Sequence, residues 1–499
     1  GEDNKLELAE SREKAESGES ITITSTGAGT DHKIVDATHT SESESTSGAS
    51  SGNIGIAGSL AINEVDVDTT AVISTGASIS VVDGDDTEPA KGAVTLTTES
   101  QTRAVAQALP QEDGASGEAF GMGASVAVNV ANNDTESLLD DSAVLSDTNR
   151  VDDLSLSATG DNSMNTVAKG GATASGGVAL TPVVAISVAL NDAVAGVGTP
   201  DGLAPTTTVE GDLNITAILD SDTRTVAEGD AEGSDAAIGA SLGLGISSDN
   251  VFAQLERDWT STGGSVLLSA QGANASRTTA KAAAKGAAED DGVEGSGDDN
   301  GVNDQVDAQR GLANTRSSEG TGTQDTPDAE TADTDDTDGE TGDDATGDSV
   351  SVAAAIAVNI TESNSVARVD GITIDTQGSV TLRSGANTDG SATADGSTTD
   401  GSTGIGAAVA LNVTDVDNTA GVGGTADVTG DGITVEAVMT DRDGKDVHET
   451  SAKATSGAGA SGVGVAGSLA INATVVRTTA LLEGGAQVTL RDGNGDGIG

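Results

Sequence analysis

The amino-acid sequence predicts an elongated all-β repeat protein, most simply a parallel β-solenoid, and three observations favour this fold class. The stretch GSLAIN at 58–63 recurs at 467–472, and similarity continues beyond both copies. A pattern of small and apolar residues ending in Asn recurs about every 60 residues. Aromatic residues make up only 1% of the 499 residues, while Gly contributes 68. Because aromatic side chains normally fill wide cores, this composition predicts a thin core of Ala, Val, Ile and Leu.

The recurring pattern marks seven copies of one unit. Six copies end on Asn63, Asn129, Asn191, Asn359, Asn412 and Asn472, and a degenerate copy, LGLGIS, ends at Ser247. Asn tolerates turn conformations and can also stack along a solenoid. We therefore expect these residues to form turns or an internal amide ladder and to bind no ligand.

The segments of each unit follow one another in a fixed order. A signature strand such as SVAVNV (125–130) precedes a polar turn, a short apolar piece, an alternating strand such as LSLSAT (154–159) and an Ala/Thr/Gly-rich return. In SVAVNV the three valines face one way and the Ser, Ala and Asn face the other, so we expect both faces to be covered. With strands of five to seven residues, a unit would form about three rungs, and the chain a rod on the order of 100 Å long. Stacked antiparallel hairpins are the alternative.

Four regions follow from this pattern. A charged segment and a partial repeat occupy 1–52, four repeats occupy 53–288, an acidic low-complexity insertion occupies 289–347, and three repeats, the last truncated, occupy 348–499. The chain is expected to be a window cut from a longer array.

Local propensity favours a helix in two places. ELAESREKAE (7–16) predicts a short helix. RTTAKAAAKGAA (277–288) has weak helical periodicity, but its position in the repeat predicts a strand.

The charge of the chain excludes several partners. Eighty-one acidic residues against 22 basic ones give a formal charge of −59. Nucleic acid is excluded as a partner because binding it needs a cationic surface, and anionic membranes are disfavoured for the same reason. Adaptation to high salt and cation-binding loops are two explanations of the acidity. The most apolar run, 463–476, is too short and too interrupted by Gly to span a bilayer, so we expect no membrane insertion. The absence of Cys excludes disulfides and thiolate metal sites.

One motif has the spacing of metal ligands. DGNGDG (492–497) places Asp492, Asn494 and Asp496 at alternate positions before a Gly, as in the first half of a calcium loop. Calcium is therefore the one cofactor that the sequence suggests. The three His residues, His32, His39 and His448, form no arrangement typical of catalysis, so we expect no enzyme.

The repeat unit resembles those of large secreted bacterial filamentous adhesins and leukotoxin-type exoproteins. The resemblance is clearest in GMGASVAVNV (121–130) with Asn133 and Thr135, in IGAAVALNVTDVDNTAGV (405–422), and in 464–490. It covers nearly all of the chain except the insertion. It implies a β-solenoid stalk at the cell surface or in an extracellular filament, and it carries over no functional residues.

The sequence thus predicts a structural, extracellular solenoid, with calcium as a candidate stabilising ion. Its partners would be neighbouring repeats of a longer chain, like subunits in a filament, or a cell-surface or matrix ligand. The alternative is a ligand-binding solenoid that recognises ice, a mineral or a polysaccharide through Thr rows such as ITIT (21–24) and TLTT (95–98). A polysaccharide-degrading enzyme is the least favoured interpretation.

Overall fold

The computed structural model describes residues 4–7, 12–16, 20–26, 38–82, 92–141, 143–145, 151–198, 206–286, 349–442 and 444–491. Every regular element in these ranges is a β-strand, and every pair of named strands is parallel. The predicted parallel β-solenoid is confirmed, and the hairpin alternative is wrong for these residues.

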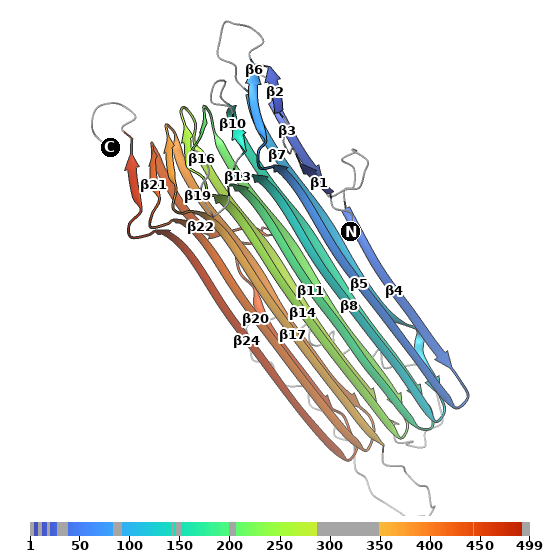
Figure 1. Cartoon of the computed structure of the whole chain (residues 1–499). Coiled ribbons are helices and arrows are strands. Elements are labelled where there is room, and N and C mark those ends of the chain that lie inside the picture. Colours follow the sequence, from blue (N-terminus) through green and yellow to red (C-terminus); the bar gives the residue numbers. More distant parts are fainter. Residues whose placement is uncertain are drawn as a thin grey trace, which may run out of the picture.

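Two long sheets form the body (Figure 1). The sheet called here the front sheet contains β1 (Asn4–Glu7), β5 (Ile54–Ile73), β8 (Phe120–Leu139), β11 (Val178–Val197), β14 (Ala236–Leu255), β17 (Val350–Val369), β20 (Thr403–Val422) and β24 (Val463–Leu482). The back sheet contains β3 (Ser20–Thr26), β4 (Thr38–Ser50), β7 (Gly92–Gly117), β10 (Val151–Ala174), β13 (Leu213–Gly233), β16 (Val266–Lys285), β19 (Ser379–Thr399), β22 (Gly432–Met439) and β23 (Thr450–Ala458).

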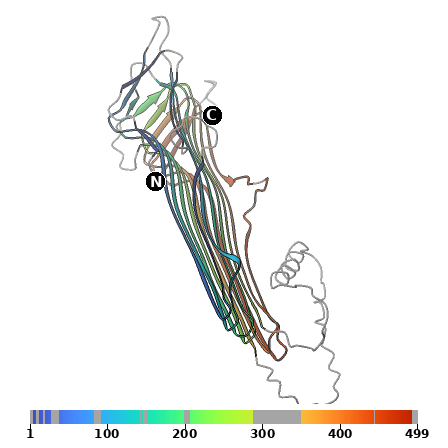
Figure 2. The same ribbon diagram turned by 90° about the vertical axis from the view of Figure 1, so that its right-hand side faces the viewer.

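Two short sheets close one end of the body. One contains β12 (Thr207–Val209), β15 (Trp259–Ser261), β18 (Thr373–Thr376), β21 (Asp427–Gly430) and β25 (Gln487–Leu490). The other contains β2 (Arg12–Glu16), β6 (Ser78–Val82) and β9 (Val144–Leu145). Figure 2 shows the two long layers lying close together and separating at the end where the short strands lie.

Each repeat of about 60 residues is one rung, not three. The chain runs along a front strand, turns through a short strand, and returns along a back strand before the next front strand begins. Asn359 therefore pairs in register with Asn412, and Asn412 with Asn472, on directly neighbouring strands. At about 3.3 Å per residue and 4.8 Å between strands, the body is longer along its 20-residue strands than along its stack. The expected 100 Å stack of rungs is wrong.

The strands are long because they continue through polar residues that are typical of turns. The stretch ANNDT (131–135), predicted as a turn, lies inside β8. In a parallel stack, the corresponding residues of successive repeats lie beside one another. Asn132 of β8 donates a hydrogen bond to Asp66 of β5 over 3.2 Å. These side-chain hydrogen bonds between rungs satisfy groups that would otherwise favour a turn.

The short helix predicted over 7–16 is also wrong, because Arg12–Glu16 is strand β2. The strand predicted over 277–288 is confirmed as far as Lys285 by β16.

The interior over most of the rung is thin and built from small residues. One buried cluster of 15 side chains consists entirely of alanines from both long sheets. The sheets approach so closely that a Cβ atom on Gly123 would lie 1.9 Å from the carbonyl oxygen of Gly171. The predicted thin core is confirmed, because Ala, Gly, Ser and Thr are the side chains that such a gap admits.

The large buried side chains gather where the short strands separate the layers. Trp259, Leu255 and Ile215 belong to this wider core. The buried Arg257 lies at its edge and donates to the carbonyl oxygen of Ala143 over 3.0 Å and to Thr207 Oγ1 over 3.0 Å. This guanidinium joins the two short sheets, since Ala143 precedes β9 and Thr207 begins β12.

Candidate functional site: the outer face of the front sheet

The front sheet turns its large apolar side chains outward. In β8 the buried residues alternate with partly exposed ones from Phe120 to Leu139, and Ala127 and Asn129 are buried while Val126 and Val128 are not. The small residues face the back sheet because the gap between the layers excludes larger ones. The large residues of the same strand consequently face away from the protein.

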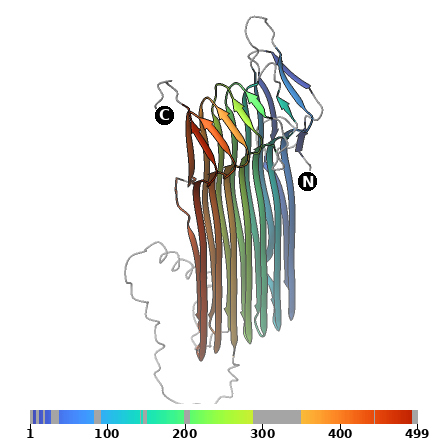
Figure 3. The ribbon, with the colours of Figure 1, turned by 60° about the vertical axis from the view of Figure 1, so that its left-hand side comes forward.

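These outward residues form one continuous surface, which we call the apolar field. It consists of every second residue from Ile54 to Glu64 in β5 and their register partners in β8, β11, β14, β17, β20 and β24. Glu64 and Thr403 are its only polar members. Figure 3 shows the strands that carry it lying side by side as a nearly flat layer.

The apolar field is open to solvent in the described structure. Ile62 is 60% exposed at one edge, Leu469 is 52% exposed at the other, and Ile356 is 43% exposed between them. The sequence predicted that both faces of these strands would be covered. From β5 to β20 only the small-residue face is covered, because the back sheet packs on that side alone.

A polar band borders the field along the same strands. Asp68, Asp134 and Asp192 lie in register on β5, β8 and β11. The pKa of Asp134 is raised by its partial burial and then by the neighbouring carboxylate of Asp192, while a hydrogen bond from Asn132 lowers it. The carboxylates of this band therefore lie close enough to repel one another.

The outer face of the back sheet is polar by contrast. It carries ion pairs such as Lys169 with Glu228 at 2.7 Å and Arg277 with Asp222 at 3.0 Å. Arg442, from the loop between β22 and β23, also lies 3.4 Å from Asp222, so the chain covers part of this face itself. The two outer faces thus differ in chemistry, and only the front one is apolar.

The predicted Asn positions form ladders inside the solenoid. Asn63 donates to Asn129 over 3.0 Å, and Asn359 donates to Asn412 over 2.9 Å. Asn412 in turn donates to Asn472 over 2.7 Å. The amides therefore stack between rungs, which is one of the two roles that the sequence allowed.

Two copies were aligned wrongly from sequence. Asn191 lies in register with Asn133, not Asn129, which pairs with Ser187. Ser247 lies beside Ala189, two residues from the ladder position. The local match of SVALN (187–191) to SVAVN concealed a shift of four residues, because alternation keeps the same residues inside after any even shift.

The second ladder ends on a buried carboxylate. Asn133 donates to Asn191 over 2.7 Å, and Asn191 donates to Asp249 over 2.6 Å. Ser221 and Asn274 also donate to Asp249. Burial raises the pKa of Asp249 to about 6, although these hydrogen bonds act to lower it.

The raised pKa of Asp249 predicts a pH-dependent stability. Below pH 4 the carboxyl is protonated in the folded and unfolded states alike, and above pH 6 it is ionised in both. Between these values the folded state binds more protons, so the free energy of unfolding should fall as the pH rises, by about 3 kcal/mol in total.

Asp249→Asn should remove this loss and stabilise the protein at pH 7. Asn274 Oδ1 has no hydrogen-bond partner, so turning its amide would supply an acceptor for the amide group introduced at position 249. Urea unfolding of both proteins at pH 4 and pH 7 measures the effect. A variant that is less stable than the parent at pH 7 would show that the charge is favourable where it lies.

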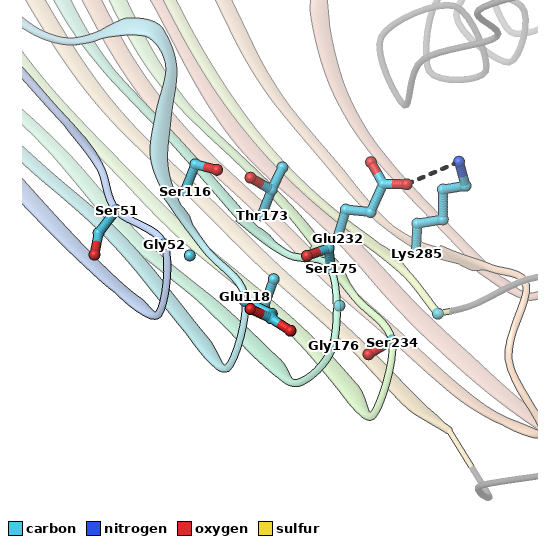
Figure 4. A pocket seen from close by; sticks show the side chains of 14 residues that line it. Ser51, Gly52, Ser116, Glu118, Thr173, Ser175, Gly176, Glu232, Ser234 and Lys285 are labelled. Atoms are coloured by element: carbon cyan, nitrogen blue, oxygen red, sulfur yellow. Dashed lines mark ion pairs between the residues drawn. The ribbon is translucent and has the colours of Figure 1, made fainter.

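A groove follows the turns at the end of the body away from the short strands. It has a volume of about 700 Å³ and runs past Ser51, Glu118, Ser175 and Ser234 (Figure 4). The cation beside it, Lys285, is paired with Glu232 at 3.1 Å. The turns also bond to one another, as Gly176 N donates to the carbonyl oxygen of Glu118 over 2.8 Å. The groove offers no nucleophile next to a base and is best described as the joint between stacked turns.

The Thr rows proposed for ice or mineral binding are interrupted. Thr22 and Thr95 share a register position with Leu267, and Thr24 and Thr97 share one with Arg383. The repeat therefore does not produce a regular Thr array.

The candidate calcium ligands Asp492, Asn494 and Asp496 lie outside the described residues, as do His32 and the insertion 289–347. Within the described ranges, no group of three or more His, Asp or Glu could hold a metal ion.

His448 Nδ1 accepts a hydrogen bond from the Thr388 amide over 3.0 Å, and burial lowers the pKa of this imidazole.

The comparisons with known proteins give no relative: no family model matches the chain, and no curated protein or solved structure is significantly similar to it. In the described part of the chain, no helix is long and apolar enough to cross a membrane.

Sequence reasoning missed the apolar field although its signal was present. The alternation in SVAVNV placed the valines on one face, and six further copies repeated that placement. The rung size was the missing information, because only one rung per repeat aligns all seven sets of large residues into one surface.

Proposed function

We propose that this chain is a structural, non-catalytic module of an extracellular surface adhesin or filament, and that it works by docking through its apolar field. The single observation that carries this proposal is the unbroken apolar surface on seven neighbouring strands. Large exposed apolar surfaces on proteins mark interaction sites, because their exposure to water is costly. The resemblance of the repeats to those of secreted filamentous adhesins supports an extracellular role.

The solenoid suits this role because it is a rigid support. Ladders of hydrogen bonds hold the rungs in register, and the thin interior leaves the outer residues no room to turn inward. Side chains on the field are thus held in a fixed flat array. The polar back face keeps the opposite side in water.

Adsorption to defined surfaces tests the proposal. The intact chain should bind a methyl-terminated monolayer and bind a hydroxyl-terminated one at least about tenfold less, measured with a quartz crystal microbalance. Val184→Lys with Leu242→Lys places two charges in the centre of the field and should abolish most of this binding.

A matched control separates the field from net charge. Ser157→Lys with Thr216→Lys adds the same charge at neighbouring outward positions on the back sheet. This control should bind as the parent chain does. Equal adsorption of both double variants would overturn the proposal that the field is the docking surface.

A further inference from the structure

The apolar field is large enough to form a stable protein interface. It extends over six outward positions on seven strands, which is roughly 33 Å by 29 Å, or about 1,000 Å². The largest apolar patch of a typical monomer is about 300–600 Å². A standard interface buries about 800 Å² on each partner, and obligate dimers bury more than about 2,000 Å² in total.

We propose that the occupant of the apolar field is a second copy of this chain, packed face to face about a two-fold axis parallel to the direction in which the rungs stack. The inference rests on the proposed function, because it names the partner of the same surface. Two flat apolar sheets pack well at about 10 Å separation, as in β-sandwiches. The field and its own copy are matched in size, shape and polarity.

Other occupants fit the surface less well. The carboxylates of Asp68, Asp134 and Asp192 border the field, so the head groups of an anionic lipid surface that covered the field would lie against like charges. Phe120 is the one aromatic side chain in the field, so there is little to stack on sugar rings. These properties leave another apolar protein face as the best complement.

The shape of the field sets the orientation of the two copies. One row across the strands contains only small residues and Pro, from Gly58 through Ala124 and Ala240 to Gly467. The next row contains large residues, including Leu60 and Leu242. A two-fold axis along the stack, centred on the field, places the large row of each copy over the small row of the other. The interface would then interdigitate.

The polar band beside the apolar field lies differently in the two possible arrangements. With the axis along the stack, the front strands of the two copies run in opposite directions, and the carboxylates of Asp68, Asp134 and Asp192 lie at opposite ends of the interface. With the axis along the strands, the order of the strands is reversed in the second copy, so Asp134 would face Asp417 and Asp68 would face Arg477. The choice of axis therefore rests on the packing of the large row of each copy over the small row of the other.

Sedimentation velocity of the intact chain tests the dimer. We expect twice the 48.4 kDa mass of one chain for the parent and for the Ser157→Lys/Thr216→Lys control. The Val184→Lys/Leu242→Lys variant should sediment as a monomer with an unchanged circular dichroism spectrum. A parent chain that is monomeric at all concentrations, or a dimer that survives the field substitutions, would overturn the inference.

A single spin label on Asn364→Cys tests the orientation, because the chain contains no other Cys. Asn364 is in register with Asp134 and Asp192 of the polar band. This row lies four and a half rows of outward residues from the proposed axis. The two labels of a dimer should lie about 60 Å apart, whereas an axis along the strands would bring them within about 20 Å. The shorter distance would contradict the proposed orientation.

Two further results would separate this inference from the proposed function. A monomer that adsorbs to the methyl surface through its field would leave the proposed function standing and remove the second copy as partner. A monomer that floats with phosphatidylcholine vesicles would replace the second copy by a lipid surface. A chain that shows neither self-association nor field-dependent adsorption would remove both proposals.

Discussion

Gly123→Ala should destabilise the protein by about 3 kcal/mol or more, although it adds a single methyl group. The new Cβ atom would lie 1.9 Å from the carbonyl oxygen of Gly171 and 2.8 Å from its carbonyl carbon. Real Cβ atoms do not approach backbone this closely, so the two sheets must move apart. Because strands β8 and β10 are hydrogen-bonded on both sides, such a movement disturbs neighbouring rungs as well.

Gly58→Ala is the matched control for this substitution. Gly58 is also in the front sheet, but it faces outward, and the only atom near its added Cβ is the carbonyl oxygen of Ala124 at 3.9 Å. Ala is favoured over Gly in a strand by up to about 1 kcal/mol, so this variant should be as stable as the parent or slightly more stable. Urea unfolding followed by circular dichroism compares the three proteins. Equal destabilisation by both substitutions would contradict the assignment of inner and outer faces.

The fold class could be predicted from the sequence because the signals were local and repeated. The near-identity of the stretches that end at Asn63 and Asn472 indicated a repeat, and the shortage of aromatic residues indicated a thin interior. Both features depend on residue type alone. The parallel pairing followed because identical units that stack in register place Asn beside Asn.

Strand length and register could not be predicted in the same way. Asn132 and Asp134 have turn propensity, but in β8 they lie beside Asp66 and Asp68 of the previous rung, where side-chain hydrogen bonds make a strand acceptable. The register of Asn191 depends on packing along the whole of β11, not on the five residues that resemble the signature. These are tertiary effects, which single-sequence patterns do not contain.

The candidate site was only half predictable. The valines of SVAVNV were placed on one face, but whether that face is covered depends on how many rungs each repeat makes. With three rungs per repeat, signature strands would be separated by other strands, and no continuous apolar field could form. With one rung, Val126, Val184 and Leu242 become direct neighbours. The number of rungs per repeat therefore decides the fold, the ladder and the docking surface together.

The distance between distant repeats measures the rung size directly. Thr97 of β7 and Glu436 of β22 occupy the same register position on the outer face of the back sheet, five strand spacings apart. At about 4.8 Å per strand this separation is about 24 Å, whereas three rungs per repeat would give about 72 Å. The two values differ threefold, which is far more than the length of a spin label can obscure.

Double electron–electron resonance on the Thr97→Cys/Glu436→Cys chain, labelled at both positions and diluted with unlabelled chain, makes this measurement. The chain contains no other Cys, so labelling is restricted to the two sites. A main distance near 24 Å, widened by the label arms, is the result predicted for one rung per repeat. A main distance near 72 Å would contradict it and remove the continuous apolar field.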